Sequence, residues 1–224
     1  MMLQWIDIGL DLELLENKID VLVLESQEVY ADFMEKVICS LESKESIFVL
    51  YENEKKLNFG KNVEIIFSPL LLDLNSKRIQ AYLFDELKEV SDEYAYEAKE
   101  RMNAVIVNYL DELAQKVSYP LKFRLELDER QLFKQYEVGI EYNEENLLER
   151  TMNYIQIQSS LCAKKVLIFA NAKSYFTEEQ LQELYKCAFY NKMHLIMVES
   201  FKDTVLQEEK YCIIDTDRCI IQHD

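Results

Sequence analysis

The chain has 224 residues, of which 49% are hydrophobic, with three glycines and two prolines, so it is long enough for a sizeable core and has no low-complexity linker. Its formal net charge is −17, from 42 acidic and 25 basic residues. This charge repels phosphates at long range and argues against non-specific binding to nucleic acid or anionic membranes unless basic residues gather locally. No apolar run approaches the roughly 18 residues of a membrane span, and the acidic N-terminal stretch does not resemble a signal peptide. We expect a cytoplasmic protein with no membrane partner.

The cysteines indicate neither a disulfide framework nor a zinc site. The five cysteines include no CxxC pair, and only two histidines, His194 and His223, accompany them. Tetrahedral zinc needs four such ligands, usually at short spacings. No nucleophile–base pair can be assembled from either histidine, so we name no catalytic residue and expect reduced thiols.

The first part of the chain alternates short apolar runs with a helical pattern. Residues 1–18 favour a strand or hairpin, and Ile19–Leu24 (IDVLVL) is typical of a strand buried on both faces. Ser26 is a suitable N-cap for the helix that follows. Further strands are predicted at Ile47–Tyr51 and Val63–Phe67, with a polar connection over Glu54–Lys61 between them.

The junction after the first buried strand excludes a nucleotide-binding P-loop. Such a loop needs glycines that let backbone amides approach phosphate, followed by a Lys-Ser/Thr pair. Here the residues are Glu25-Ser26-Gln27-Glu28, with no glycine and two carboxylates. We therefore reject ATP hydrolysis.

A helical stretch then interrupts the strand-and-helix pattern. One face is expected along Ile79–Val90, and a longer helix from Asp92 to about Val117 carries an apolar arc broader than one partner helix requires. That breadth indicates burial against a second chain. Pro120 ends the helix, and Leu121–Leu127 (LKFRLEL) alternates like an exposed strand.

Strand and helix patterns resume after this stretch, which predicts an α/β protein with a mostly parallel central sheet. Its head would comprise residues 1–75 and 137–224, with an α-helical leg over 76–136. The elements expected in the second half are a helix at Gln131–Tyr136, a strand-like run at Val138–Ile140, a helix over 144–161, a buried strand at Lys165–Ala170, a helix from the capping box at Thr177, a strand at Met193–Val198 and a closing hairpin over 212–221.

Four segments occur in an order that resembles a known family. They are IDVLVLES, SPLLLDLNSKRIQAYLFDELKE, LELDERQL and KKVLIFANAKSYFTEEQLQEL. Together they resemble the small CRISPR-associated adaptation protein peculiar to subtype II-A systems, the Csn family. The resemblance covers most of the chain as short collinear blocks.

The resemblance implies a fold, an assembly and a function. It implies a head of degenerate P-loop ATPase-like shape with an inserted helical leg, assembled as a homotetrameric ring. Such a ring threads double-stranded DNA from its ends, is stabilised by calcium and has no established catalytic activity. It acts in spacer acquisition, with the integration proteins and the effector nuclease as partners.

The resemblance also implies a calcium site after the leg. The family pattern Leu-x-Leu-Glu-x-Asp-Glu aligns with residues 123–129, so that Glu126, Asp128 and Glu129 become the expected ligands. Calcium takes six to eight oxygens, which clustered carboxylates can supply. Spacing alone favours a solvated acidic turn with Asp128 as a helix cap. Arg124 stands where members of the family carry an acidic residue, which puts the metal count in doubt.

The DNA-binding residues expected on this basis lie at the two ends of the leg and in two loops. A ring of four copies would concentrate them around a hole and allow contacts to phosphates without base reading. For each residue alone, ordinary surface charge is the simpler explanation. The candidates are Lys77, Arg78, Lys122, Arg124, Lys173, Lys55 and Lys56.

Two alternative functions stay open. Asp73, Asn75 and Lys77 loosely match a metal-dependent nuclease core, although Asn takes the second ligand position and Asn75 or Ser76 would also cap a helix. The other alternative is a structural scaffold whose acidic surface docks basic integration proteins.

Overall fold

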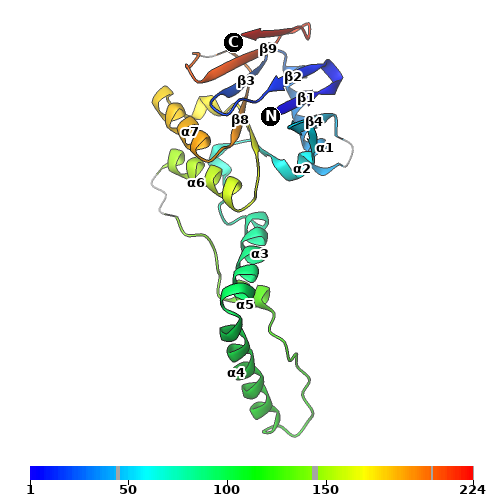
Figure 1. Ribbon diagram of the computed structural model, residues 1–224, viewed down its shortest axis with the longest axis vertical. Helices are drawn as coiled ribbons and strands as arrows, with labels where there is room; N and C mark the ends of the chain where they lie inside the picture. The colour runs from blue at the N-terminus through cyan, green and yellow to red at the C-terminus, as the bar shows by residue number, and fades with distance from the viewer. Residues whose placement is uncertain (44–45, 143–145, 203, 224) are drawn as a thin grey trace. The chain divides into compact units, whose positions relative to one another are not determined.

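The computed structural model describes residues 1–43, 46–142, 146–202 and 204–223 (Figure 1). The chain forms two compact units, one comprising residues 1–74 and 142–224 and the other Asn75–Glu141. We call them the head and the inserted unit. None of the described helices is long and apolar enough to cross a membrane.

The head is built on a six-stranded sheet with strand order β10-β9-β3-β8-β7-β6. The five strands from β9 to β6 run parallel, and β10 is antiparallel to β9. Every residue of β3 and β7 is buried, as expected of strands covered on both faces. The strands are β3 (Ile19–Leu24), β6 (Val63–Ile66), β7 (Val166–Ala170), β8 (His194–Glu199), β9 (Glu209–Ile214) and β10 (Ile220–His223).

The head also contains a second, antiparallel sheet with strand order β2-β1-β4-β5. Its buried side chains and those on one face of the central sheet form a single hydrophobic core. Trp5, Phe33 and Phe48 form its aromatic centre, with ring centroids 5.0–5.5 Å apart. The elements are β1 (Met2–Trp5), β2 (Leu10–Glu13), β4 (Phe48–Glu52), β5 (Lys55–Leu57), α1 (Gln27–Glu42) and α2 (Phe59–Asn62).

Helices α6 (Leu147–Ser160) and α7 (Glu178–Tyr190) pack against each other, on the side of the central sheet away from α1 (Figure 1). The capping box at Thr177 is present, as predicted, and so is the Ser26 cap of α1. The central layer between helices on both sides makes this an α/β protein. Three short 3₁₀ helices, η1 (Ile6–Ile8), η2 (Pro69–Leu71) and η3 (Ala172–Tyr175), complete the head.

The inserted unit contains α3 (Lys77–Tyr94), α4 (Tyr96–Ala114) and α5 (Glu129–Gln135). Ala95 has φ −126° and ψ 16°, outside helical values, and it separates α3 from α4. The two helices predicted here are confirmed as α3 and α4, although the break lies at Ala95 rather than just before Asp92 and α4 ends at Ala114 rather than near Val117. The strands predicted at Leu121–Leu127 and Val138–Ile140 are wrong, because both segments are irregular.

The inserted unit is closed by contacts between its first and last residues. The side chain of Asn75 donates to the carbonyl of Ile140 (2.9 Å) and accepts from its amide (2.8 Å). Gly139 permits this approach, because a Cβ there would lie 2.7 Å from Asn75 Oδ1. This tie keeps residues 137–141 in the inserted unit, whereas the sequence prediction placed them in the head.

Candidate functional site

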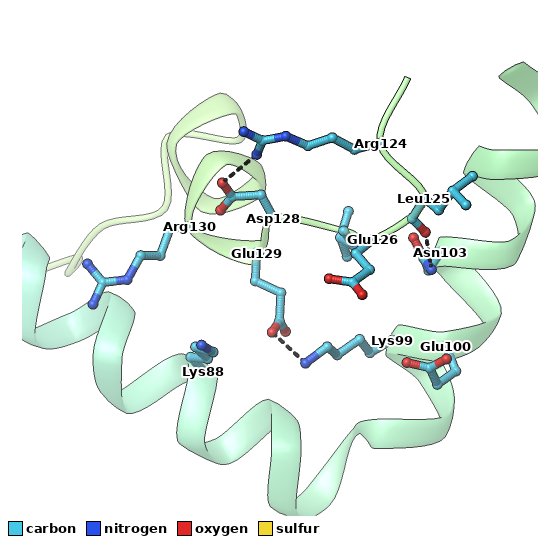
Figure 2. Close-up of a pocket in the computed structure, with 11 residues that line it drawn as sticks. Lys88, Lys99, Glu100, Asn103, Arg124, Leu125, Glu126, Asp128, Glu129 and Arg130 are labelled. Carbon is cyan, nitrogen blue, oxygen red and sulfur yellow. Dashed lines mark hydrogen bonds and ion pairs between the residues drawn. The ribbon is translucent and has the colours of Figure 1, made fainter. Parts of the chain in front are cut away.

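The inserted unit contains an open pocket of about 830 Å³ between α3, α4 and the chain that enters α5 (Figure 2). Its charged lining is balanced, with four basic and four acidic side chains: Lys88, Lys99, Arg124, Arg130, Glu100, Glu126, Asp128 and Glu129. All three carboxylates of the predicted calcium site are among them.

Glu129 is the buried member of this group, at 7% exposure. Its carboxylate accepts from Ser91 Oγ at 2.5 Å and pairs with Lys99 Nζ at 2.8 Å. The same ammonium lies 2.6 Å from Asp92 Oδ1. The pKa of Lys99 is raised above its ordinary value, chiefly by the hydrogen bond to Asp92 and next by the one to Glu129. The side chain is therefore a cation at neutral pH.

Asp128 is engaged in a different way. Its Oδ1 accepts from the Gln131 amide at 3.2 Å and caps α5, as the sequence suggested, while Oδ2 lies 3.6 Å from Arg124. Glu126 is exposed, and its carboxylate points into the pocket (Figure 2). Arg130 pairs with Asp85 of α3, which adds a second link between α5 and α3.

The predicted calcium ligands do not fit a metal site in this arrangement. Among the residues that the structure describes, no three His, Cys, Asp or Glu side chains are placed to hold one ion. Glu129 faces Lys99, and Asp128 faces a helix terminus and Arg124. Cationic side chains therefore lie against two of the three predicted ligands.

Six of the seven predicted DNA contacts are exposed. Lys77 and Arg78 begin α3, and Lys55 and Lys56 lie on β5. Lys122 and Arg124 lie in the irregular segment before α5, and of these six only Arg124 lines the pocket.

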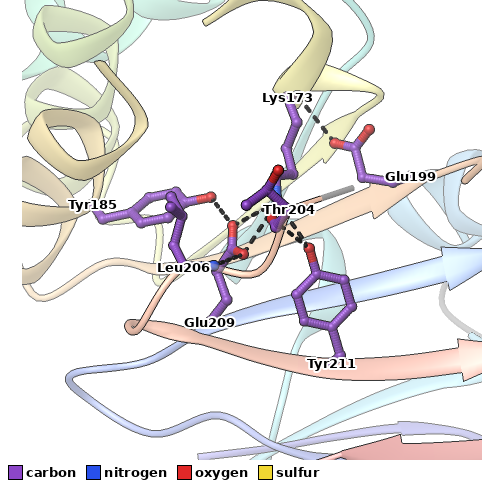
Figure 3. A network of polar contacts seen from close by, with 7 residues as sticks. All are labelled: Lys173, Tyr185, Glu199, Thr204, Leu206, Glu209 and Tyr211. Atoms are coloured by element: carbon purple, nitrogen blue, oxygen red, sulfur yellow. Dashed lines mark hydrogen bonds and ion pairs between the residues drawn. The ribbon is translucent and has the colours of Figure 1, made fainter. Parts of the chain in front are cut away.

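The remaining candidate, Lys173, belongs to a buried network in the head (Figure 3). Its ammonium lies 2.9 Å from Glu209 Oε1 and donates to Tyr211 Oη at 2.8 Å and to the Thr204 carbonyl at 2.9 Å. Burial alone would lower the pKa of Lys173, but the hydrogen bonds of Tyr211 and Glu209 outweigh it and raise that pKa. This geometry contradicts the prediction that Lys173 contacts DNA, because a buried and fully engaged ammonium is not available to a phosphate.

The network around Lys173 holds the end of β9 against α7. Tyr185 of α7 donates to Glu209 Oε1 at 2.6 Å, and burial followed by the Glu209 charge raises the pKa of its hydroxyl. Glu209 also accepts from the Leu206 amide at 2.8 Å. Lysine and carboxylate thus satisfy each other inside the core.

The head has its own pocket, of about 480 Å³, at the carboxyl ends of β7 and β8. Asn171 organises it from a left-handed conformation (φ 48°), donating to Tyr30 Oη at 2.9 Å and accepting from the Ser200 amide at 3.0 Å. The nine described residues that line the pocket include no glycine, lysine or arginine. The described lining therefore lacks both the glycine and the lysine of a P-loop.

The sequence did not reveal Lys99, Lys88 or Arg130 as parts of the site. Lys99 and Glu129 lie on different helices, and their pairing depends on the break between α3 and α4 and on the position of α5 beside it. The sequence offered one indication of the role of Glu129. This residue lies at the start of a helix, where acidic residues are common.

Fold and site together define an α/β protein in which a helical unit, inserted between β6 and α6, carries a charged three-helix junction. Residues 40–218 match the family model described as CRISPR-associated protein (Cas_Csn2). The chain belongs to this CRISPR-associated Csn2 family, which confirms the resemblance seen in the sequence. A curated relative, the CRISPR-associated protein Csn2 of Enterococcus faecalis, is 23% identical over 172 residues, which cover 74% of this chain and 75% of the relative.

Proposed function

We propose that this protein is a non-catalytic ring that binds double-stranded DNA ends during CRISPR spacer acquisition. The observation that carries the proposal is the exposed apolar surface of α4, a helix with no buried residue. Val105 is 67% exposed and Tyr109 60%, and Ile106 and Leu113 add to the same helix. A helix this apolar and this uncovered gains from burial against other copies of the chain, and we propose a homotetramer.

The exposed basic residues support backbone contacts with DNA. Lys77 and Arg78 on α3, Lys122 and Arg124 before α5, and Lys55 and Lys56 on β5 all reach solvent. Cyclic assembly would repeat each pair around one axis and offset the net charge of −17 locally. The contacts would carry no base specificity.

We propose that the head is a degenerate P-loop ATPase-like domain, retained for its shape. Its parallel strand order β9-β3-β8-β7-β6 and its ligand-poor pocket support this interpretation. The integration proteins and the effector nuclease are the partners proposed from the family. We do not extend the proposal to stabilisation by calcium, because Asp128 and Glu129, two of the three carboxylates expected to bind it, already pair with other groups.

The decisive experiment compares a linear duplex with the same sequence as a closed circle, by mobility shift at low salt and by light scattering for mass. We expect a tetramer that shifts the linear duplex only and is released as salt rises. Lys77→Glu with Arg78→Glu should weaken binding at least tenfold, whereas Lys186→Glu with Lys202→Glu, a matched charge change in the head, should not. Absence of any shift of linear DNA would sink the proposal, and equal binding of circles would refute the preference for ends.

The nuclease alternative loses support from the position of Asn75, whose amide is bonded to Ile140. Incubating supercoiled plasmid with magnesium or manganese separates the two functions, because a clamp leaves the plasmid intact. The scaffold alternative predicts that DNA binding disappears without the integration proteins, so purified protein alone distinguishes it.

A further inference from the structure

We infer that the ammonium of Lys99 is the structural cation of the inserted unit and takes the place of a bound metal ion at the junction of α3, α4 and α5. The inference concerns the stability of this unit and does not depend on DNA binding. Among the described residues, the side chains that meet in the pocket do not form the calcium site expected from the family.

Three helices contribute to one charged contact, of which Figure 2 shows the pair of Lys99 and Glu129. Lys99 comes from α4, Asp92 and Ser91 from the last turn of α3, and Glu129 from the first residue of α5. The ammonium lies 2.6 Å from Asp92 and 2.8 Å from Glu129, and Ser91 donates to the second oxygen of Glu129 at 2.5 Å. Two carboxylates from separate helices thus converge on a single cation.

The burial of Glu129 makes that cation necessary. A carboxylate at 7% exposure has lost most of its hydration and requires an opposite charge and hydrogen bonds in compensation. Its two oxygens have Lys99 and Ser91 as partners. Without the ammonium, the carboxylates of Asp92 on α3 and Glu129 on α5 would lose the cation that both contact.

The remaining charges of the pocket fit the same interpretation. Arg124 lies 3.6 Å from Asp128, and Arg130 pairs with Asp85, so side-chain cations also oppose the neighbouring carboxylates. A calcium site would require six to eight oxygens around one point, and the described residues provide no group of three carboxylates for it. Positively charged side chains thus occupy the place that a bound calcium ion would take.

The first test measures thermal unfolding and calcium titration calorimetry on the full-length protein. For wild type we expect no saturable calcium binding and the same melting temperature in calcium and in chelator. For Lys99→Met, which keeps the length and removes the charge, we expect a lower melting temperature that calcium partly restores, since Asp92 and Glu129 then lack a cation. Lys88→Met, in the same pocket, is the control and should change neither quantity.

The second test covers the case in which Lys99→Met does not fold. Lys99→Met combined with Glu129→Gln removes both charges and should recover folding, and Lys99→Arg should keep the wild-type indifference to chelator. Saturable binding of calcium by wild type, with a rise in melting temperature, would overturn the inference. So would a Lys99→Met variant that melts with wild type, or one that is destabilised but indifferent to calcium. DNA binding and oligomeric mass are measured separately, so failure here is distinguishable from failure of the proposed function.

Discussion

The carboxyl group of Asp20 lies in the buried strand β3, opposite Lys210 of β9. Burial raises its pKa from 3.8 to about 7, against the attraction of Lys210 and of the chain's amino group. The folded protein then holds a proton that the unfolded chain has already lost. The protonated Asp20 carboxyl therefore contributes fully to stability below its ordinary pKa of 3.8. That contribution is lost as the pH rises through the pKa of about 7 in the folded protein.

Replacing Asp20 with asparagine should remove this loss. We expect Asp20→Asn to exceed wild type in unfolding free energy at pH 8 by a few kcal/mol, since one pKa unit corresponds to about 1.4 kcal/mol. The difference should shrink toward zero near pH 4. Urea unfolding across this range measures it, and His194, whose pKa burial lowers, affects both proteins alike. Parallel pH profiles for the two proteins would contradict the assignment.

Lys173 gives a second prediction at this scale. Lys173→Met leaves Glu209 buried without its cation, which should lower the unfolding free energy by about 3–5 kcal/mol. The folded fraction should bind DNA as wild type does. Lys186→Met on the exposed side of α7 is the control and should lose less than about 0.5 kcal/mol. A variant that is stable but poor in DNA binding would instead restore Lys173 as a contact.

Single residues also show where sequence interpretation succeeds. Ser26, Ser76 and Thr177 cap helices because each side chain accepts from an amide three residues on, a purely local geometry. Lys173 failed because it follows a buried strand in a loop, which normally indicates exposure. Its burial comes from Glu209 and Tyr211, which the sequence places far away.

At the scale of elements, α4 carries the prediction about assembly. Val105→Glu with Tyr109→Glu places two charges on its exposed apolar surface and should reduce the oligomeric mass without lowering the stability of the single chain. Ala104→Glu with Asn108→Glu adds the same charge about 100° around the helix and should have a smaller effect. Light scattering and thermal unfolding measure the two quantities. An unchanged mass for the first variant would exclude this surface as the interface.

The buried strands were predictable and the exposed segments were not. The strand expected at Ile19–Leu24 has the bounds of β3, because a run that is apolar at every position except Asp20 needs a position inside a parallel sheet. The alternation of Leu121–Leu127 misled because a strand also needs a partner, and here the Leu125 carbonyl accepts from the Asn103 side chain instead.

The small sheet illustrates the limit of local patterns. Hairpin strand β5 follows Asn53 and Glu54, both at positive φ, without the glycine that normally indicates such a turn. The pairing of Trp5 with Phe48 in β1 and β4 joins distant segments, and periodicity alone does not choose partners. The sequence therefore indicated strands without dividing them between two sheets.

For the whole molecule, the closure of the inserted unit by Asn75 and Ile140 yields a further prediction. Gly139→Ala brings a methyl group to 2.7 Å from Asn75 Oδ1 and should cost about 1–3 kcal/mol of unfolding free energy. In Asn75→Ala the same glycine substitution should cost much less, since the obstructing oxygen is absent. A double-mutant cycle in urea measures this coupling. Additive effects would show that the contact does not constrain the closure.

The charge of the whole chain gave the least guidance about its site. A net charge of −17 describes the far field, whereas the pocket in the inserted unit balances four basic against four acidic side chains. That balance is created by folding, which brings α3, α4 and α5 together. Composition alone did not reveal it.

The tie between Asn75 and Ile140 also bears on how such a chain can diverge. The hydrogen bonds between the two ends of the inserted unit offset the entropic cost of closing this segment into a loop. That cost grows only slowly with the length of the loop. Helical turns can therefore be gained or lost between these two residues while the neighbouring strands keep their register. Relatives should differ in the length of this segment far more than in the strands that flank it.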